Sequence, residues 1–135
     1  MKNNIELLEL EELALEYCRQ RGLVVDRNFH HHGDSRLNLL IQNGSDDNPI
    51  GVIIKDWKRA VGVDIIIRSE QVLKDNRYLG KVLIIANVFS DPARSLAEKI
   101  GIFLLTRNDL LRILASDLST DTVNDSNKQQ DIMMY

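Results

Sequence analysis

The stretch KVLIIANVF, residues 81–89, restricts the possible folds of this chain more than any other feature. Residues 82–86 are all apolar and lack the alternation of polar and apolar positions that marks a strand with one solvated face. Such a run is typical of a β-strand that is covered on both faces. A sheet covered on both faces needs helices on each side, so we expect an α/β fold.

The rest of the chain contains helical and extended patterns that can be assigned in order. Helices are expected over residues 4–21, from Ser69 as N-cap to a stop at Gly80, over 90–101 and over 107–118. Strands are expected over residues 23–29, 36–42, 52–58, 81–89 and 102–106. Residues 30–35 read as a polar turn, and 62–68 as a short strand or the lead into a helix.

The order of these elements predicts a mixed sheet. Residues 43–51, NGSDDNPIG, contain Asn-Gly and Asn-Pro breakers, which indicates a hairpin and an antiparallel first half. Strands and helices alternate in the second half, which indicates a parallel portion. We expect one domain over residues 1–118. Residues 119–135 contain few apolar positions before the last four, which predicts a disordered tail.

Composition sets limits on the class of protein. The chain has 135 residues, of which 44% are hydrophobic, which suits a single domain. No apolar run approaches the roughly 20 residues that span a bilayer. The single cysteine, Cys18, excludes an internal disulfide, so a cytoplasmic, reduced protein is expected. The net charge of −3 argues against a generic nucleic-acid binder, although residues 55–81 hold seven basic and four acidic side chains.

The motif Asp56-Trp57-Lys58 follows an apolar strand pattern and is the main candidate for chemistry. In an extended chain Asp56 and Lys58 share a face, where a carboxylate can hold Mg²⁺ and a lysine can stabilise phosphoryl charge. The same spacing also occurs at ordinary solvated strand ends. A metal site needs a second acid, but the neighbouring strand offers Asn38, and the nearest acid upstream is Asp34.

Two long segments resemble the PD-(D/E)xK nuclease superfamily, in particular archaeal Holliday-junction resolvases and Mrr-type restriction endonucleases. The first segment is IGVIIKDWKRAVGVDIIIRSEQV, residues 50–72, in which an apolar strand ends in the D-x-K motif. The second is KVLIIANVFSDPARSLAEKIGIFLLTRNDLLRIL, residues 81–114. The likeness covers roughly residues 8–115. It implies a restriction-endonuclease-like three-layer fold, an αβββαβ core with a further C-terminal strand and helix.

The resemblance implies a metal-dependent endonuclease that hydrolyses DNA phosphodiester bonds, on linear or branched DNA, with Mg²⁺ or Mn²⁺ as cofactor and with a homodimer as in resolvases. By analogy, Asp56, Lys58 and Glu11 would be catalytic, and Asp56, Asn38, Asp34 and the backbone carbonyl of Trp57 would hold the metal. Gln71 matches a glutamine of the family that lies near the site. Two departures count against activity: Asn38 stands where the family has an acid, and Asp56 is shorter than glutamate.

Other readings of the same residues remain open. Lys55, Arg59, Arg68 and Lys74 can contact phosphates without reading sequence, or can form a solvated face. Asn38 and the acidic net charge favour a weakened nuclease-fold module that binds DNA or a protein partner. A small α/β protein with an accidental D-x-K motif is the third alternative.

Overall fold

The computed structural model of this chain describes residues 7–42, 44 and 48–118. The predicted C-terminal tail, residues 119–135, therefore lies outside the described residues. The elements follow in the order α1 (Leu10–Gln20), β1 (Val24–Asp26), α2 (Phe29–His32), β2 (Leu39–Gln42), β3 (Ile50–Lys55), α3 (Val63–Asp75), β4 (Lys81–Ala86), α4 (Asp91–Ile100), β5 (Phe103–Thr106) and α5 (Arg107–Leu118).

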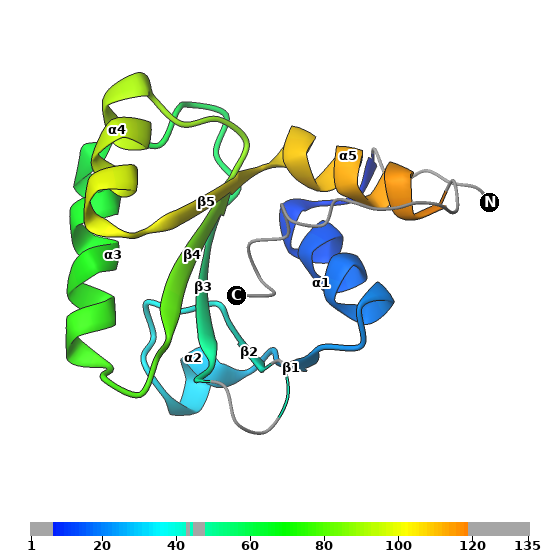
Figure 1. The fold of residues 1–135 in the computed structure, drawn as a ribbon, viewed down its shortest axis with the longest axis horizontal. Helices are drawn as coiled ribbons and strands as arrows, with labels where there is room; N and C mark the ends of the chain where they lie inside the picture. Colours follow the sequence, from blue (N-terminus) through cyan, green and yellow to red (C-terminus); the bar gives the residue numbers. More distant parts are fainter. Residues whose placement is uncertain (1–6, 43, 45–47, 119–135) are drawn as a thin grey trace.

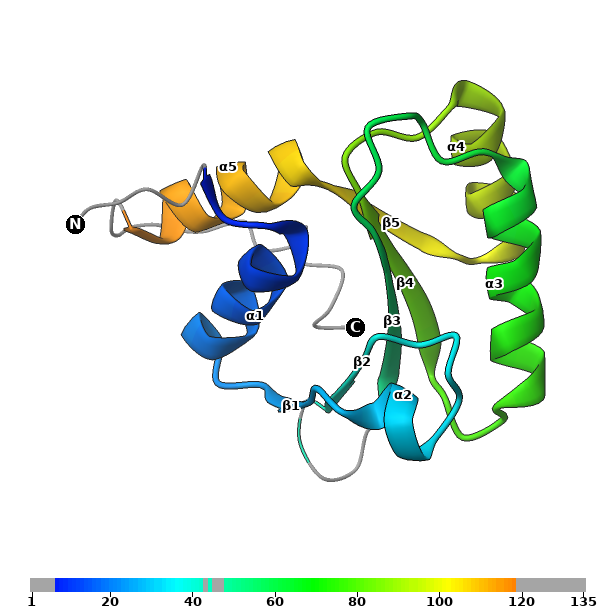
Figure 2. The same ribbon diagram turned by 180° about the vertical axis from the view of Figure 1, so that it is seen from behind.

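The strands form a five-stranded sheet in the order β1-β2-β3-β4-β5. The pairs β1–β2 and β2–β3 are antiparallel, and the pairs β3–β4 and β4–β5 are parallel. Helices cover both faces, with α1 and α5 on one side and α3 and α4 on the other (Figures 1 and 2). The expected restriction-endonuclease-like, three-layer α/β fold with a mixed sheet is confirmed.

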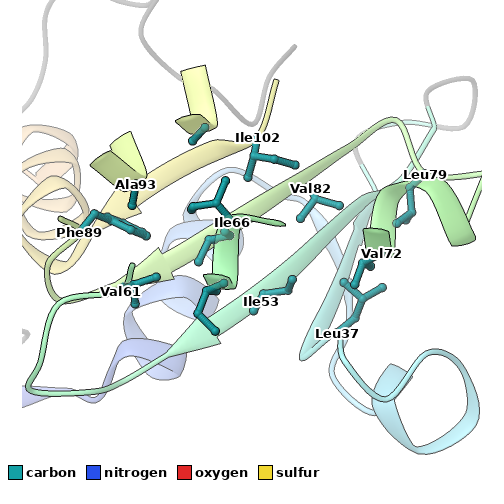
Figure 3. Close-up of a cluster of buried hydrophobic side chains, with 14 of the residues drawn as sticks. Leu37, Ile53, Val61, Ile66, Val72, Leu79, Val82, Phe89, Ala93 and Ile102 are labelled. Carbon is teal, nitrogen blue, oxygen red and sulfur yellow. The ribbon is translucent and has the colours of Figure 1, made fainter. Parts of the chain in front are cut away.

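Strand β4 lies between the two hydrophobic layers, as its sequence predicts. Leu83 and Ile85 pack with α1 and α5, and Val82, Ile84 and Ala86 pack on the opposite face. All five side chains are fully buried. Figure 3 shows the second layer, in which β3 and β4 pack against the helices on that side. Burial of this kind stabilises by about 1.5–3 kcal/mol for each large aliphatic side chain.

Helix α3 begins earlier than predicted. The helix starts at Val63 with Gly62 as N-cap, so Ser69 is an interior residue and not the cap. The Ser69 hydroxyl is buried and donates to the carbonyl of Ile65 at 2.8 Å. The run Ile65–Ile67 has the β-branched side chains of a strand, but burial of one face of the helix outweighs that preference.

Two further expectations on local structure were wrong. The predicted strand over 52–58 ends at Lys55, so the alternation that would place Asp56 and Lys58 on one face does not apply. The predicted turn over 30–35 begins inside a short helix, α2, which buries Phe29. Phe29 supplies the apolar anchor, because its ring fills the space where a Cβ at Gly33 would lie.

The segment before β2 is joined to the C-terminal end of α3 by a polar network around Asp34. Arg36 donates to Asp34 Oδ1 through Nε at 2.9 Å and to Oδ2 through Nη2 at 2.7 Å. The Asn76 amide also donates to Oδ2 at 2.7 Å, and Arg36 reaches Asp75 at 2.9 Å. These bonds from Arg36 hold the pKa of Asp34 well below its usual range, against the opposing effect of burial, and the Asn76 bond adds to them.

The Asp34 network predicts a dependence of stability on acid. The pKa of Asp34 is lower in the folded than in the unfolded chain, where it is about 4. Ionised Asp34 therefore stabilises the fold above about pH 4, and this contribution is lost as the pH falls further. Asp34→Asn should lower the free energy of unfolding at pH 7 by about 1–2 kcal/mol and weaken its decline in acid. Urea unfolding at several pH values measures both effects.

Glu98→Gln, at an exposed position of α4, is the matched control and should leave both quantities unchanged. Equal acid dependence of the Asp34→Asn variant and the wild type would show that the network adds nothing to stability.

Candidate functional site

Three polar residues stand in a row at the carboxyl ends of the parallel strands. Asp56 directly follows β3, Asn87 directly follows β4, and Arg107 directly follows β5 as the first residue of α5. The registers pair Lys55 with Ala86, and Ala86 with Thr106, so the next residues of the three strands are neighbours. The carboxyl ends of parallel strands are where open α/β sheets commonly place their sites.

The Asn87 side chain links this row to the D-x-K motif. Its Nδ2 donates to Asp56 Oδ1 at 2.9 Å and to the backbone carbonyl of Trp57 at 2.7 Å. Its Oδ1 accepts from Arg107 Nε at 2.9 Å. The Asp56 carboxylate and the Trp57 carbonyl, both predicted as metal ligands, thus converge on the nitrogen of one amide.

Arg107 and the start of α1 complete the surroundings of Asp56. Arg107 Nη2 lies 3.7 Å from Asp56 Oδ1, and Nη1 donates to the Leu8 carbonyl at 2.7 Å. The Leu10 backbone N–H, in the first turn of α1, donates to Asp56 Oδ2 at 3.2 Å. The positive end of the α1 dipole therefore also faces this carboxylate.

These contacts determine the charge state of Asp56. Partial burial raises the pKa of Asp56, but the Asn87 amide, the Leu10 N–H and the Arg107 guanidinium together hold that pKa below its ordinary value. Asp56 is therefore a carboxylate at neutral pH, with a positive charge and two hydrogen-bond donors already in place. Its side chain remains 40% exposed to solvent.

Asn38 lies beside β3 but uses its side-chain oxygen for the backbone. Oδ1 accepts from the Ile54 N–H at 2.8 Å, and the Asn38 N–H donates to the Val52 carbonyl at 2.8 Å. Asn38 thereby extends the β2–β3 pairing to the position before the first residue of β2. The oxygen that was expected to reach a metal instead satisfies a backbone donor of the sheet.

Asp34 lies near the amino ends of the parallel strands, at the opposite end of the sheet from Asp56. It is bonded to Asn76, which follows α3 shortly before β4 begins, whereas Asp56 lies where β3 ends. Because β4 has six residues, the amino and carboxyl ends of the parallel strands are separated by about 17–20 Å. The structure therefore does not bring Asp34 to Asp56, and one ion cannot bind both. The hydrogen bonds from Asn76 to Asp34 and from Arg36 to Asp75 hold this acid beside the C-terminal end of α3.

The remaining predicted catalytic residues lie on the Asp56 side but do not touch it in any described interaction. Glu11 is in the first turn of α1, next to Leu10, and lies 3.8 Å from Arg27. Lys58 is exposed, in the segment that follows β3. Trp57 is partly buried against the α3–α4 layer, so only its carbonyl faces Asn87.

The residues that were predicted to bind nucleic acid divide into two groups. Lys55 and Arg59 surround Trp57, with the Lys55 ammonium 5.3 Å and the Arg59 guanidinium 4.0 Å from the ring centroid. Arg68, Gln71 and Lys74 are instead on the outer side of α3. Gln71 donates to Asp75 at 2.8 Å, and Lys74 lies 3.9 Å from Glu70. Gln71 is thus at the far end of α3 from Asp56.

The described residues do not form a site that fits Mg²⁺. Within them, no group of three or more His, Cys, Asp or Glu side chains is placed to hold a metal ion. Mg²⁺ requires oxygen ligands in near-octahedral geometry. At Asp56 the carboxylate Oδ1 and the Trp57 carbonyl already accept hydrogen bonds from Asn87, Oδ2 accepts from the Leu10 N–H, and Asn38 is bonded to the sheet.

Asn87 and Arg107 were not predicted as site residues, although the sequence contains a pattern that indicates them. Each apolar run of the parallel portion, VIIK, KVLIIA and FLLT, is followed at once by a polar residue: Asp56, Asn87 and Arg107. Aligning the ends of the three runs would have placed the residues side by side, because parallel strands end at one edge.

Comparisons with known proteins extend these findings. The model of the Mrr_cat family, described as restriction endonuclease, matches residues 3–114. A solved structure of a protein of unknown function, AF1548, is similar in fold, with a TM-score of 0.62 over 78% of this chain at 12% identity. This chain spans 66% of that protein, just under two thirds of its length. No curated protein matches. Among the described helices none is both long and apolar enough to cross a membrane.

The position of Asn38 predicts a structural cost for its removal. Asn38→Ala should lower the free energy of unfolding by about 1–2 kcal/mol, because the partly buried Ile54 N–H loses its acceptor. Asn38→Asp keeps an acceptor oxygen at the same place and should cost less. Urea unfolding at neutral pH gives both values, with Asn108→Ala, at an exposed position of α5, as control. If Asn38→Ala were as stable as the control, Asn38 would have no structural role.

Proposed function

We propose, because the chain belongs to the restriction endonuclease family of the Mrr type, that it is a nuclease-fold domain that binds the DNA backbone without hydrolysing it. The observation that carries the loss of hydrolysis is the state of Asn38. This residue stands where the resemblance implies an acid, and its oxygen accepts from the Ile54 N–H. A second carboxylate therefore does not join Asp56 from the neighbouring strand.

The basic segment after β3 supports binding to DNA. Lys55, Lys58 and Arg59 follow one another closely, and Lys58 and Arg59 are exposed. The Trp57 ring holds Lys55 and Arg59 near each other through cation–π contacts. Phosphate contacts from such residues are independent of sequence and weaken steeply with salt. Because the net charge is −3, binding depends on this local group and not on the charge of the whole chain.

Hydrolysis of linear or branched DNA is the alternative function, and the experiment must distinguish it from binding without cleavage. It requires a divalent ion at Asp56 and a water molecule activated beside Lys58. A homodimer, implied by the likeness to resolvases, would present two Lys55–Arg59 segments to one duplex. The mass in solution, measured by light scattering with and without DNA, tests this part of the proposal.

The proposal predicts binding without cleavage. Fluorescence anisotropy with linear and four-way-junction DNA in EDTA should show binding that weakens with salt. Lys58→Ala and Arg59→Ala should each weaken binding and lower the salt slope by about 0.9 for each phosphate that the variant no longer neutralises. Lys99→Ala, at an exposed position of α4, is the control with the same change of charge. With Mg²⁺ or Mn²⁺ added, gels should show intact DNA.

Cleavage by the wild type that Lys58→Ala abolishes would identify an active enzyme and contradict the proposal. Absence of binding at low salt would exclude the nucleic-acid function altogether. Cleavage gained in Asn38→Asp alone would show that the missing acid is the whole reason for inactivity.

A further inference from the structure

We infer that the Asn87 amide and the Arg107 guanidinium take the place of a divalent metal ion at Asp56, so that this site is complete without metal. The inference concerns how the site is neutralised and held together. It stands whether or not the domain binds DNA.

The first observation is the position of one nitrogen atom. Asn87 Nδ2 is within hydrogen-bond distance of both Asp56 Oδ1 and the Trp57 carbonyl, at 2.9 and 2.7 Å. These are the two oxygens of the D-x-K motif that would converge on a metal ion. An amide nitrogen carries two hydrogens and can satisfy both oxygens at once. It therefore occupies the point on which the two oxygens converge.

The second observation is the source of the positive charge. Arg107 Nη2 lies 3.7 Å from Asp56 Oδ1 and balances the charge of the carboxylate. The guanidinium is fixed in place, because Nε donates to Asn87 Oδ1 at 2.9 Å and Nη1 to the Leu8 carbonyl at 2.7 Å. Its side chain is only 26% exposed. A divalent ion at Asp56 would be repelled by this fixed charge, which solvent screens only in part.

The third observation is that the network joins four separate parts of the chain. Asp56 follows β3, Asn87 follows β4, Arg107 begins α5, and Leu8 immediately precedes Glu9, the N-cap of α1. Leu10, in the first turn of α1, donates to the second oxygen of Asp56. A metal ion in such a site would cross-link its ligands, and here the side chains themselves provide the cross-link. The hydrogen bonds and the ion pair around Asp56 therefore hold these parts of the chain together without a cation.

Asn87→Asp tests this inference in solution, because it replaces the donating nitrogen with an oxygen. The new carboxylate can still accept from Arg107 Nε, but it faces the oxygens of Asp56 and Trp57. Without metal, the repulsion among these oxygens should lower the unfolding temperature. With metal, the new carboxylate, the Asp56 carboxylate and the Trp57 carbonyl should bind the ion together. We expect saturable Mn²⁺ binding that is at least about tenfold tighter than the detection limit of the wild-type titration.

The measurements are isothermal titration calorimetry with Mn²⁺ alone, and unfolding temperatures in EDTA and in millimolar Mn²⁺. Asn108→Asp is the matched control, because it adds the same charge on an exposed side chain next to Arg107, in the first turn of α5. The wild type and Asn108→Asp should show no saturable binding and no stabilisation by Mn²⁺. Asn87→Asp should gain both, and the double variant with Asp56→Asn should lose them again.

A folded Asn87→Asp variant that does not respond to Mn²⁺ would overturn the inference. Saturable Mn²⁺ binding by the wild type that is absent in Asp56→Asn would overturn it as well. If Asn87→Asp does not fold, this comparison of wild type with Asp56→Asn decides, and equal absence of saturable binding supports the inference. None of these readouts uses DNA, so failure of the proposed DNA binding leaves them unaffected.

Discussion

The burial of β4 on both faces is the constraint on which the rest of the structure depends. Because this strand has no solvated face, helices must cover both sides of the sheet, and its parallel neighbours must be connected by α3 and α4. Parallel strands end at a common edge. That edge brings Asp56, Asn87 and Arg107 together from positions that are far apart in the sequence. The core of the sheet thus determines which side chains meet.

Polar groups at the carboxyl ends of the parallel strands bind one another. Asp56 is compensated by Arg107, and it accepts hydrogen bonds from Asn87 and Leu10. A carboxylate that shares its site with another acid has to bind a cation or a proton, whereas a carboxylate beside a guanidinium needs neither. The likeness to restriction endonucleases therefore extends to the fold, and the described contacts of Asp56 are an ion pair with Arg107 and hydrogen bonds from Asn87 and Leu10.

Much of the fold could be predicted from the sequence, because it follows from local patterns. The apolar run before Asn87 identified the buried strand, and the helix predicted over 90–101 is α4, with Ser90 as its N-cap and Gly101 as its C-cap. The start of α3 could not be predicted in this way. Its isoleucines favour a strand locally, and only burial against the sheet makes the helix the better state.

The candidate site could be predicted only in part. Asp56 was chosen for its place after an apolar strand, and Asn38, predicted as a metal ligand, accepts from the Ile54 N–H instead. The partners of these residues could not be predicted from spacing, since Asn87 and Arg107 reach Asp56 across 31 and 51 positions of the chain. Asp34 shows the opposite error. Its distance along the sequence was compatible with a shared site, but Arg36 and Asn76 hold it at the other edge.

The claim that the site is complete without metal is tested most directly by crystallography in the presence of Mn²⁺. Wild-type crystals grown in millimolar Mn²⁺ should show no anomalous peak at Asp56. The Asn87 amide should remain hydrogen-bonded to Asp56 and to the Trp57 carbonyl, with Arg107 beside the carboxylate. An anomalous peak within coordination distance of the Asp56 carboxylate and the Trp57 carbonyl, with Asn87 displaced, would contradict the account.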